Sequence, residues 1–273
     1  DQIFGTQVLT SWDLFQVFGW RRPPDGVDWD LDVDYLSLRG PGGGTSLLYN
    51  RPGFLGLQTP ASGDLDAWFI GDVGRDNLGL YRRDFLYPGY PERTFRGRSF
   101  WRHRQDLGGT TESLFGGWQL RGTAGWISDQ NFLEEYYEAE WEEGYEQRTW
   151  LDLRRPIENR QLRLLSSVRV DPFFTQSEWW PRLDHYVFGQ PLLRDAVSWY
   201  AHSSASYVRQ SLPQAPIAGQ GLDIWTLLPY ENNVIGERFA TRQELDLPFQ
   251  AGAVKIVPYA LGELAHWGED LAL

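Results

Sequence analysis

Four aspartates at alternate positions are the first residues whose spacing could support chemistry. The ladder consists of Asp28, Asp30, Asp32 and Asp34. A calcium loop of the EF-hand type needs a glycine at its sixth position and a glutamate at its twelfth. Counted from Asp28, those positions hold Val33 and Arg39. The alternation is typical of a strand with one polar face, so we expect a polar strand face here and predict no metal site.

A second ladder is basic and lies in a strand predicted at 92–105. It consists of Arg96, Arg98, Arg102 and Arg104. The planar guanidinium group matches phosphate as well as carboxylate. Two roles follow for these arginines. They either neutralise the aspartate ladder from a nearby strand or contact a phosphorylated ligand, and the sequence does not show whether the two ladders are neighbours.

An acidic run could supply an acid/base pair or a cation site. It contains Glu134, Glu135, Glu138, Glu140, Glu142 and Glu143. A glycosidase needs two carboxylates at a set separation, which a flexible segment does not provide, so we expect a solvated loop or strand end. The four histidines lack metal-ligand spacing. No nucleophile elbow, P-loop or dinucleotide fingerprint occurs. We therefore predict no enzymatic activity, no metal and no cofactor.

The aromatic content narrows the class of protein. Aromatic residues make up 15% of the chain, including 14 tryptophans. Trp141, Trp179 and Trp180 could stack on sugars, but we expect them at girdle or core positions. The net charge of −12, from 25 basic and 37 acidic residues, argues against a general nucleic-acid binder. It also argues against attachment to anionic lipid by charge.

The 273-residue chain has no cysteine and no methionine. A disulfide framework and a thiolate metal site are therefore excluded. Because neither an initiating methionine nor a signal peptide is present, we interpret the chain as an internal piece of a longer precursor. No run of 18 apolar residues predicts a transmembrane helix. A β-barrel would lack one too, because lipid-facing and lumen-facing residues alternate in its strands.

Alternation of apolar and polar residues predicts an all-β protein. On 27–38 the apolar residues Val27, Trp29, Leu31, Val33 and Tyr35 share one face, predicted to meet lipid, and the aspartates share the other. Further strands are predicted at 7–20, 45–57, 65–73, 92–105, 118–126, 147–154, 161–170, 196–209, 236–249 and 253–267, with a short one ending at Phe188. Turns are expected at 21–26 and 40–44, and long loops at 75–91 and 210–233.

These ten to twelve strands are near the ~9–11 residues needed to cross a bilayer. Trp118 and Trp126 end one strand about 26 Å apart, close to the ~25 Å height of an outer-membrane barrel's apolar band. The sequence therefore predicts an antiparallel transmembrane β-barrel. Residues 1–273 would form part of a single barrel domain, with ten to twelve strands of a larger barrel.

A resemblance to a known family starts at the segment from Trp126 to Tyr136. Ser128, Asp129, Phe132, Leu133 and Tyr136 resemble the "S-D-x-x-F-L-x-x-Y/F" pattern of the lipopolysaccharide-assembly outer-membrane proteins, also called the organic-solvent-tolerance family. Residues 94–98 resemble the family's Arg-Gly strand, and 242–249 with 254–259 resemble a downstream strand pair. The resemblance covers most of the chain, and it rests on the order and spacing of these segments.

The resemblance implies a location in the outer membrane of a Gram-negative cell and a role in lipopolysaccharide transport. The barrel would take lipopolysaccharide from periplasmic bridge proteins and release it among outer-membrane lipids through a lateral opening. A lipoprotein would plug the lumen. The family's N-terminal jelly-roll domain, its remaining barrel strands and its disulfides are not found in this chain. The arginine and aspartate ladders would line the lumenal route of the phosphorylated headgroup.

Two alternatives remain open at this stage. One is a general porin or another outer-membrane transporter, which would show the same strand pattern. The other is a soluble, aromatic-rich carbohydrate-binding β-protein. The soluble alternative predicts shorter strands of ~5–6 residues, with their apolar faces buried against each other.

Overall fold

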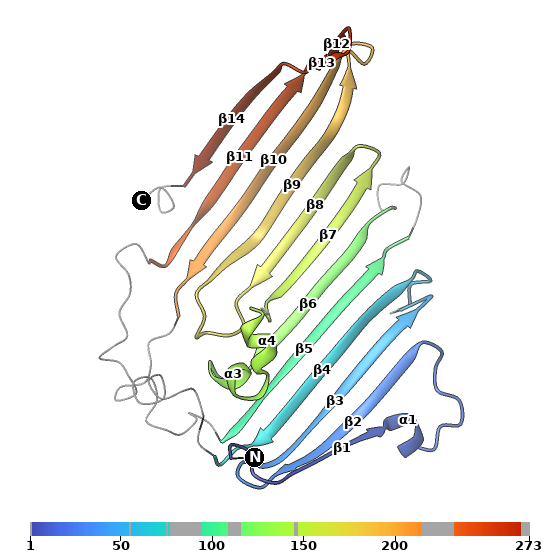
Figure 1. The fold of residues 1–273 in the computed structure, drawn as a ribbon, viewed down its shortest axis with the longest axis vertical. Coiled ribbons are helices and arrows are strands. Elements are labelled where there is room, and N and C mark those ends of the chain that lie inside the picture. The colour runs from blue at the N-terminus through green and yellow to red at the C-terminus, as the bar shows by residue number, and fades with distance from the viewer. Residues whose placement is uncertain are drawn as a thin grey trace.

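The fold is an all-β sheet in which β1 to β10 each pair with the next strand of the chain, and β11 pairs with β14 (Figure 1). The computed structural model describes residues 2–54, 56–74, 76, 94–108, 116–144, 147–213 and 232–268. Twelve antiparallel strands form one sheet, and a small hairpin projects beyond it. Within the described residues the sheet is open, with β1 and β14 at its two edges.

The twelve strands of the sheet range from seven to 17 residues. They are β1 (Gln7–Asp13), β2 (Val27–Leu36), β3 (Gly40–Arg51), β4 (Ala61–Gly71), β5 (Phe95–Asp106), β6 (Gln119–Ile127), β7 (Thr149–Ile157), β8 (Arg160–Val168), β9 (Gln176–Leu192), β10 (Val197–Ser211), β11 (Val234–Asp246) and β14 (Tyr259–Trp267). The hairpin contains β12 (Phe249–Ala251) and β13 (Val254–Ile256).

Among the described residues, three short helices interrupt the strand order: α1 (Leu14–Val17), α3 (Phe132–Tyr136) and α4 (Glu138–Glu142). None of the described helices has the length and apolar character needed to cross a membrane. The prediction of an antiparallel all-β protein with ten to twelve strands is confirmed. Closure into a barrel is not observed, because the described strands form an open sheet.

Several local predictions were wrong. The strand predicted at 7–20 ends at Asp13, whose carboxylate accepts hydrogen bonds from the backbone of Phe15 and Gln16 and so begins α1. The acidic run forms α3 and α4 instead of a loop or strand end. The long loop predicted at 75–91 falls almost entirely outside the described residues, as does most of the one at 210–233.

The glycine-rich segment 40–44 was predicted to be a turn, but it begins β3. The chain reverses at 37–39 instead. Gly44 pairs with Asp32 on one side and Trp68 on the other. A Cβ atom at Gly44 would lie 2.5 Å from the carbonyl oxygen of Ala67. Glycine is therefore used here for close strand approach, because only its missing side chain allows the backbones to come that near.

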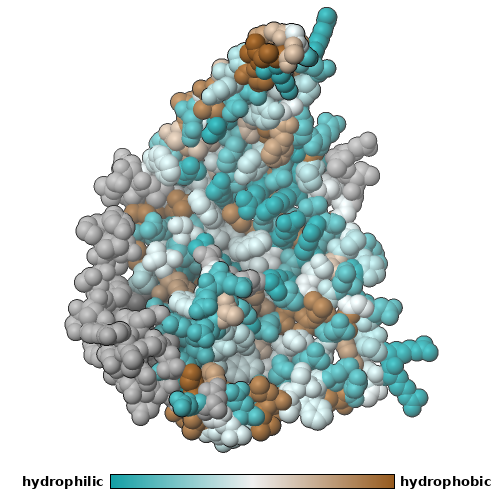
Figure 2. All heavy atoms as spheres, in the orientation of Figure 1, coloured by the Kyte–Doolittle hydropathy of each residue, from teal (hydrophilic) through white to brown (hydrophobic). Residues whose placement is uncertain are grey.

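The strand registers separate the sheet into a polar face and an apolar face. Paired residues on antiparallel strands point to the same side. Asp28 is paired through Leu48 to Asp64, and Asp64 is paired through Arg102 to Thr123, so these residues share the polar face. Figure 2 views the side that carries α3 and α4, where hydrophilic colours dominate over the middle strands.

The apolar face is largely uncovered by the described residues. It carries the odd-numbered residues of β2 and continues across the sheet to the last strands. Its exposed side chains include Val33 (53%), Leu183 (48%) and Phe239 (51%). Near one sheet end the connection after β3 folds back, and Phe54 stacks on Tyr49 with ring centroids 4.9 Å apart. At β2, helix α1 packs against this face. Elsewhere the face lacks a second layer within the described part of the chain.

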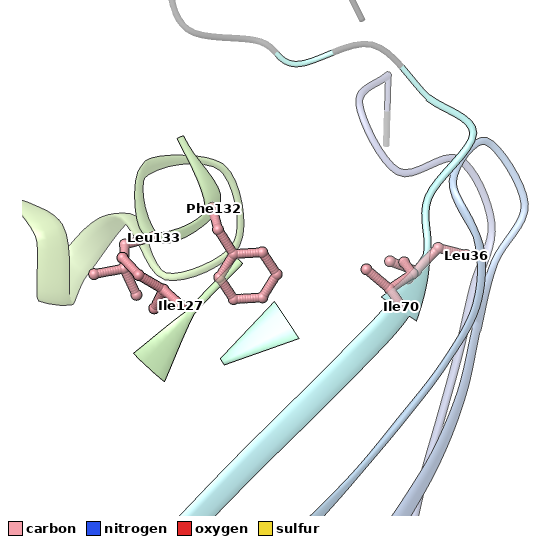
Figure 3. Packing of buried hydrophobic residues seen from close by; sticks show 5 residues of the cluster. All are labelled: Leu36, Ile70, Ile127, Phe132 and Leu133. Carbon is pink, nitrogen blue, oxygen red and sulfur yellow. The ribbon is translucent and has the colours of Figure 1, made fainter. Parts of the chain in front are cut away.

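A small hydrophobic core lies where α3 meets the end of the sheet. Its buried members are Leu36, Ile70, Ile127, Phe132 and Leu133. In Figure 3 the ring of Phe132 lies between the α3 side of this cluster and the side formed by Ile70 and Leu36. Phe132 is completely buried. The core therefore joins α3 to strands β2, β4 and β6, and it fixes the helix over the polar side of the sheet.

Candidate functional site

Two completely buried arginines lie at the end of the sheet beside α3. Arg39 ends the turn between β2 and β3, and Arg96 is the second residue of β5. Their carboxylate partners come from the connection after β4, from the segment after β6 and from α3. We call this group the arginine cluster: Arg39, Arg96, Asp72, Asp76, Asp129 and Glu135.

Arg96 is the hub of the arginine cluster. Its Nε and Nη2 donate to the two oxygens of Asp129 at 2.9 and 2.8 Å. Its Nη1 donates to Asp72 at 2.8 Å, and the same group reaches Asp76. This is the two-pronged geometry in which guanidinium binds carboxylate most strongly. Three carboxylates from two distant segments, one after β4 and one after β6, are thus held by one buried cation.

Arg39 completes the cluster on the other side of Tyr136. It pairs with Asp72 at 3.3 Å and with Glu135 of α3. The ring centroid of Tyr136 lies 5.7 Å from the guanidinium carbon of Arg39 and 5.6 Å from that of Arg96. Burial, with the neighbouring Asp72 carboxylate, raises the pKa of Tyr136. The phenol therefore stays protonated and donates to Asp72 at 2.7 Å.

The family-like residues all meet at this cluster. Phe132 and Leu133 supply the core, while Tyr136 lies between the two arginines. The Ser128 hydroxyl donates to Asp129 at 2.7 Å and accepts from the backbone N–H of Gly97 at 3.0 Å. In the structure these residues position α3 on the sheet.

The residue after Arg96 must be small, and Gly97 meets this requirement. A Cβ atom there would lie 2.4 Å from a ring carbon of Phe69 and 2.6 Å from the Trp68 carbonyl oxygen. A side chain would therefore push β5 away from β4 and shift Arg96. The segment 94–98 and the segment 128–136, which the sequence pattern singled out separately, form one physical unit.

The other members of the arginine ladder have different environments. Arg98 is also buried and pairs with Asp66 at 2.7 Å and with Glu140 of α4 at 2.6 Å. Its guanidinium carbon lies 3.4 Å from the ring centroid of Tyr137, and burial raises the pKa of that phenol to about 12. Arg102 is exposed and pairs with Asp64 at 2.9 Å. Arg104 is exposed, with no paired carboxylate among the described residues.

The two ladders share the polar face but are not adjacent. β3 and β4 separate the aspartates of β2 from the arginines of β5, so Asp64 and Asp66 of β4 neutralise Arg102 and Arg98. Within the aspartate ladder, Asp34 accepts from the Trp68 indole at 2.8 Å. Asp32 continues the ladder on the same face. Asp28 and Asp30 line a groove of about 740 Å³ together with Arg98 and Arg102.

Two further ion clusters lie on the polar face and were not predicted. Asp152 pairs with Arg154 at 2.6 Å and Arg163 at 3.0 Å. Asp184 pairs with Arg182 and His202, both at 2.9 Å. Both aspartates are completely buried beneath their partners. Opposite charges two residues apart, as in 152/154 and 182/184, lie on one strand face, and this spacing could have revealed both clusters.

Comparison with known proteins does not assign the chain to a family. No protein-family model matches the sequence, and a search of curated proteins gives no significant match. No cluster of three or more acidic or histidine side chains in the described part of the chain is placed to hold a metal ion. Within those residues the polar face is therefore organised by ion pairs and stacked rings.

Asp171, in the connection before β9, is a buried carboxyl group outside the ion clusters. Its Oδ1 accepts the backbone N–H of Ile127 at 3.2 Å. Burial raises the pKa of Asp171 from 3.8 to about 6, although that hydrogen bond acts in the opposite direction. The folded protein therefore holds a proton on this side chain more tightly than the unfolded chain does.

We expect Arg96→Met to destabilise the protein by roughly 3–5 kcal/mol, because it leaves buried carboxylates without their main cation. The matched control Arg104→Met removes an exposed arginine from the same strand and should change stability by less than about 0.5 kcal/mol. Urea unfolding in detergent measures both. Equal losses for the two variants would contradict the assignment of Arg96 as the hub.

The Asp171 carboxyl group predicts a pH dependence. A raised pKa in the folded state adds stability below the unfolded value of 3.8, and this contribution is lost as the pH rises through about 6. The urea midpoint of the native protein should therefore fall between about pH 4 and about pH 7 more steeply than that of Asp171→Asn. Parallel pH profiles for the two proteins would show that Asp171 is not the group responsible.

Proposed function

We propose that this chain forms part of the wall of an outer-membrane β-barrel that transports lipopolysaccharide to the outer leaflet. Its apolar face would contact lipid, and its polar face would line a water-filled lumen. The observation that carries the proposal is the contrast between the two faces of a single-layer sheet. One face exposes Val33, Leu183 and Phe239, and the other carries most of the ion pairs. Exposed apolar surface of this extent favours a lipid environment.

Strand length supports the membrane part of the proposal. Apart from the edge strand β1, every strand of the sheet has nine to 17 residues, and a tilted strand needs ~9–11 residues to cross a bilayer. A soluble β-protein is expected to have strands of ~5–6 residues and a second layer over its apolar face. In the proposed barrel the edges of β1 and β14 are also paired, because open edges cannot face lipid.

The lipopolysaccharide part rests on the sequence resemblance, supported by the way its residues assemble. The Arg-Gly segment of β5 and the motif from Ser128 to Tyr136 meet in the arginine cluster. A phosphorylated sugar head requires a wet lumen while its acyl chains remain in apolar surroundings, and the two faces offer both. A plug lipoprotein and periplasmic bridge proteins are the proposed partners.

The proposed route follows the exposed members of the two ladders. Arg96 and Arg98 are buried in ion pairs, so Arg102 and Arg104 are the arginines of β5 that a passing headgroup would meet. Each exposed contact of this kind is worth about 1 kcal/mol or less. Weak contacts attract a phosphorylated group without trapping it, which suits transport.

The two faces should respond differently to substitution. Leu31→Arg places a charge on the proposed lipid side of β2 and should cost roughly 2–4 kcal/mol in a bilayer. Asp32→Asn, at the next position but on the lumenal side, should cost little. Folding yields in lipid vesicles compare the two. If Asp32→Asn is as damaging as Leu31→Arg, the assignment of the faces fails.

Photo-crosslinkers in living cells test the substrate. Probes replacing Arg102 and Arg104 should capture lipopolysaccharide, because they lie on the proposed route. A probe replacing Leu120, which lies on the apolar face, should capture little beyond bulk membrane lipid. Equal capture at all three positions, or no capture at the arginines while transport continues, would contradict the route. Such a result would leave the barrel proposal standing.

A further inference from the structure

A second groove lies on the polar face, far from the arginine cluster. It extends over β9, β10, β11 and β14 and has a volume of about 710 Å³. That volume is within the range of small-molecule sites, ~300–1,000 Å³. The charged residues that line it are three arginines, one histidine and one glutamate: Arg182, Arg238, Arg242, His202 and Glu263.

The strand registers build the groove from one row across four strands. Arg182, Ser206, Arg238 and Trp267 are paired in that order. Two strand spacings separate the backbones at the two arginines, or about 9–10 Å. The residue between them is a serine, and the next row contains Ser204, Ala240 and Ala265. Small side chains therefore form a floor between two fixed cations.

Each of the two arginines is held against a tryptophan ring. The guanidinium carbon of Arg182 lies 4.9 Å from the ring centroid of Trp179, and that of Arg238 lies 4.4 Å from that of Trp267. Stacking of this kind orients a guanidinium group and leaves its N–H groups free to point along the sheet. The tryptophans also provide flat apolar walls at opposite sides of the groove.

The two arginines differ in whether a carboxylate neutralises their charge. Arg182 and His202 share the buried carboxylate of Asp184. Within the described chain Arg238 is paired with no carboxylate, and its Nη1 donates only to the Ser204 hydroxyl, at 3.5 Å. Arg238 is therefore the cation best placed to bind an anion that enters the groove.

We infer that this groove binds a phosphorylated saccharide, with Arg238 contacting the phosphate and Trp267 or Trp179 stacking on the sugar ring. Arginine recognises phosphate through paired N–H donors, and the aromatic walls suit the apolar face of a pyranose. The inference adds a binding step to the proposed transport function. It depends on the groove residues and not on closure of a barrel or on transport.

Binding to the detergent-solubilised protein tests the inference, with glucose 6-phosphate as the probe and ligand-observed saturation-transfer NMR as the measurement. Glucose and inorganic phosphate are the comparison ligands. The wild-type protein should bind glucose 6-phosphate more tightly than either. Arg238→Gln should weaken that binding about tenfold, the usual effect of losing a charge-assisted hydrogen bond. Arg160→Gln, an exposed arginine at the turn between β7 and β8, is the matched control and should leave it unchanged.

Trp267→Leu separates the sugar contact from the phosphate contact. It should reduce the affinity for glucose 6-phosphate to that for inorganic phosphate. Because Trp267 is the last residue of β14 and is 46% exposed, this variant is expected to fold, and the circular dichroism spectrum checks all variants. The inference is overturned if the wild type binds glucose 6-phosphate no more tightly than glucose or inorganic phosphate. It is also overturned if Arg238→Gln and Arg160→Gln weaken binding equally.

A competition experiment distinguishes a lipid headgroup from a soluble sugar phosphate as the source of the ligand. A diphosphorylated glucosamine glycolipid in mixed micelles should displace glucose 6-phosphate if the groove receives a lipid headgroup. Retention of the sugar phosphate in its presence would assign the groove to soluble sugar phosphates. Both results support a phosphosaccharide site. Failure of all binding would remove the groove inference but would not affect the substitution test at 31 and 32.

Discussion

A single-layer sheet exposes both of its faces, and this constraint determines most of the structure. In the described residues no second sheet covers the apolar side, so many of its side chains remain exposed. On the polar side, many charged groups are neutralised within the sheet, by a neighbour two residues away or on an adjacent strand, as Asp152 is by Arg154 and Arg163.

In the arginine cluster, ion pairs also join the sheet to its connecting segments and to α3. Arg96 connects β5 with the segments after β4 and β6, and Arg39 adds the turn between β2 and β3. Through Glu135 and the buried ring of Phe132, both arginines also fix α3 over the polar face. Buried ion pairs of this kind contribute little net stability, but they tolerate only one arrangement of the elements around them. The cluster therefore sets the position of the helical segment over the polar face.

The sequence predicted the features that depend on local alternation. The apolar positions of β2 and its aspartates lie on opposite faces, because a strand has a strict period of two. Gly44 was misassigned because glycine is common both in turns and where strands approach closely, and only the position of the neighbouring Trp68 distinguishes these uses. Arg39 and Glu135 are 96 residues apart, so their contact depends on the register of several strands. No local sequence pattern encodes a contact between residues so far apart in the chain.

We propose that one face of the sheet contacts lipid while the other contacts water. The most direct test places nitroxide labels on β8 in lipid vesicles and compares their accessibility to oxygen and to a water-soluble nickel complex. Leu164 and Leu165 are adjacent leucines whose registers place them on opposite faces. We predict high oxygen and low nickel accessibility at 164, with the reverse at 165. The same accessibility at both positions would contradict a lipid-facing and a lumen-facing side.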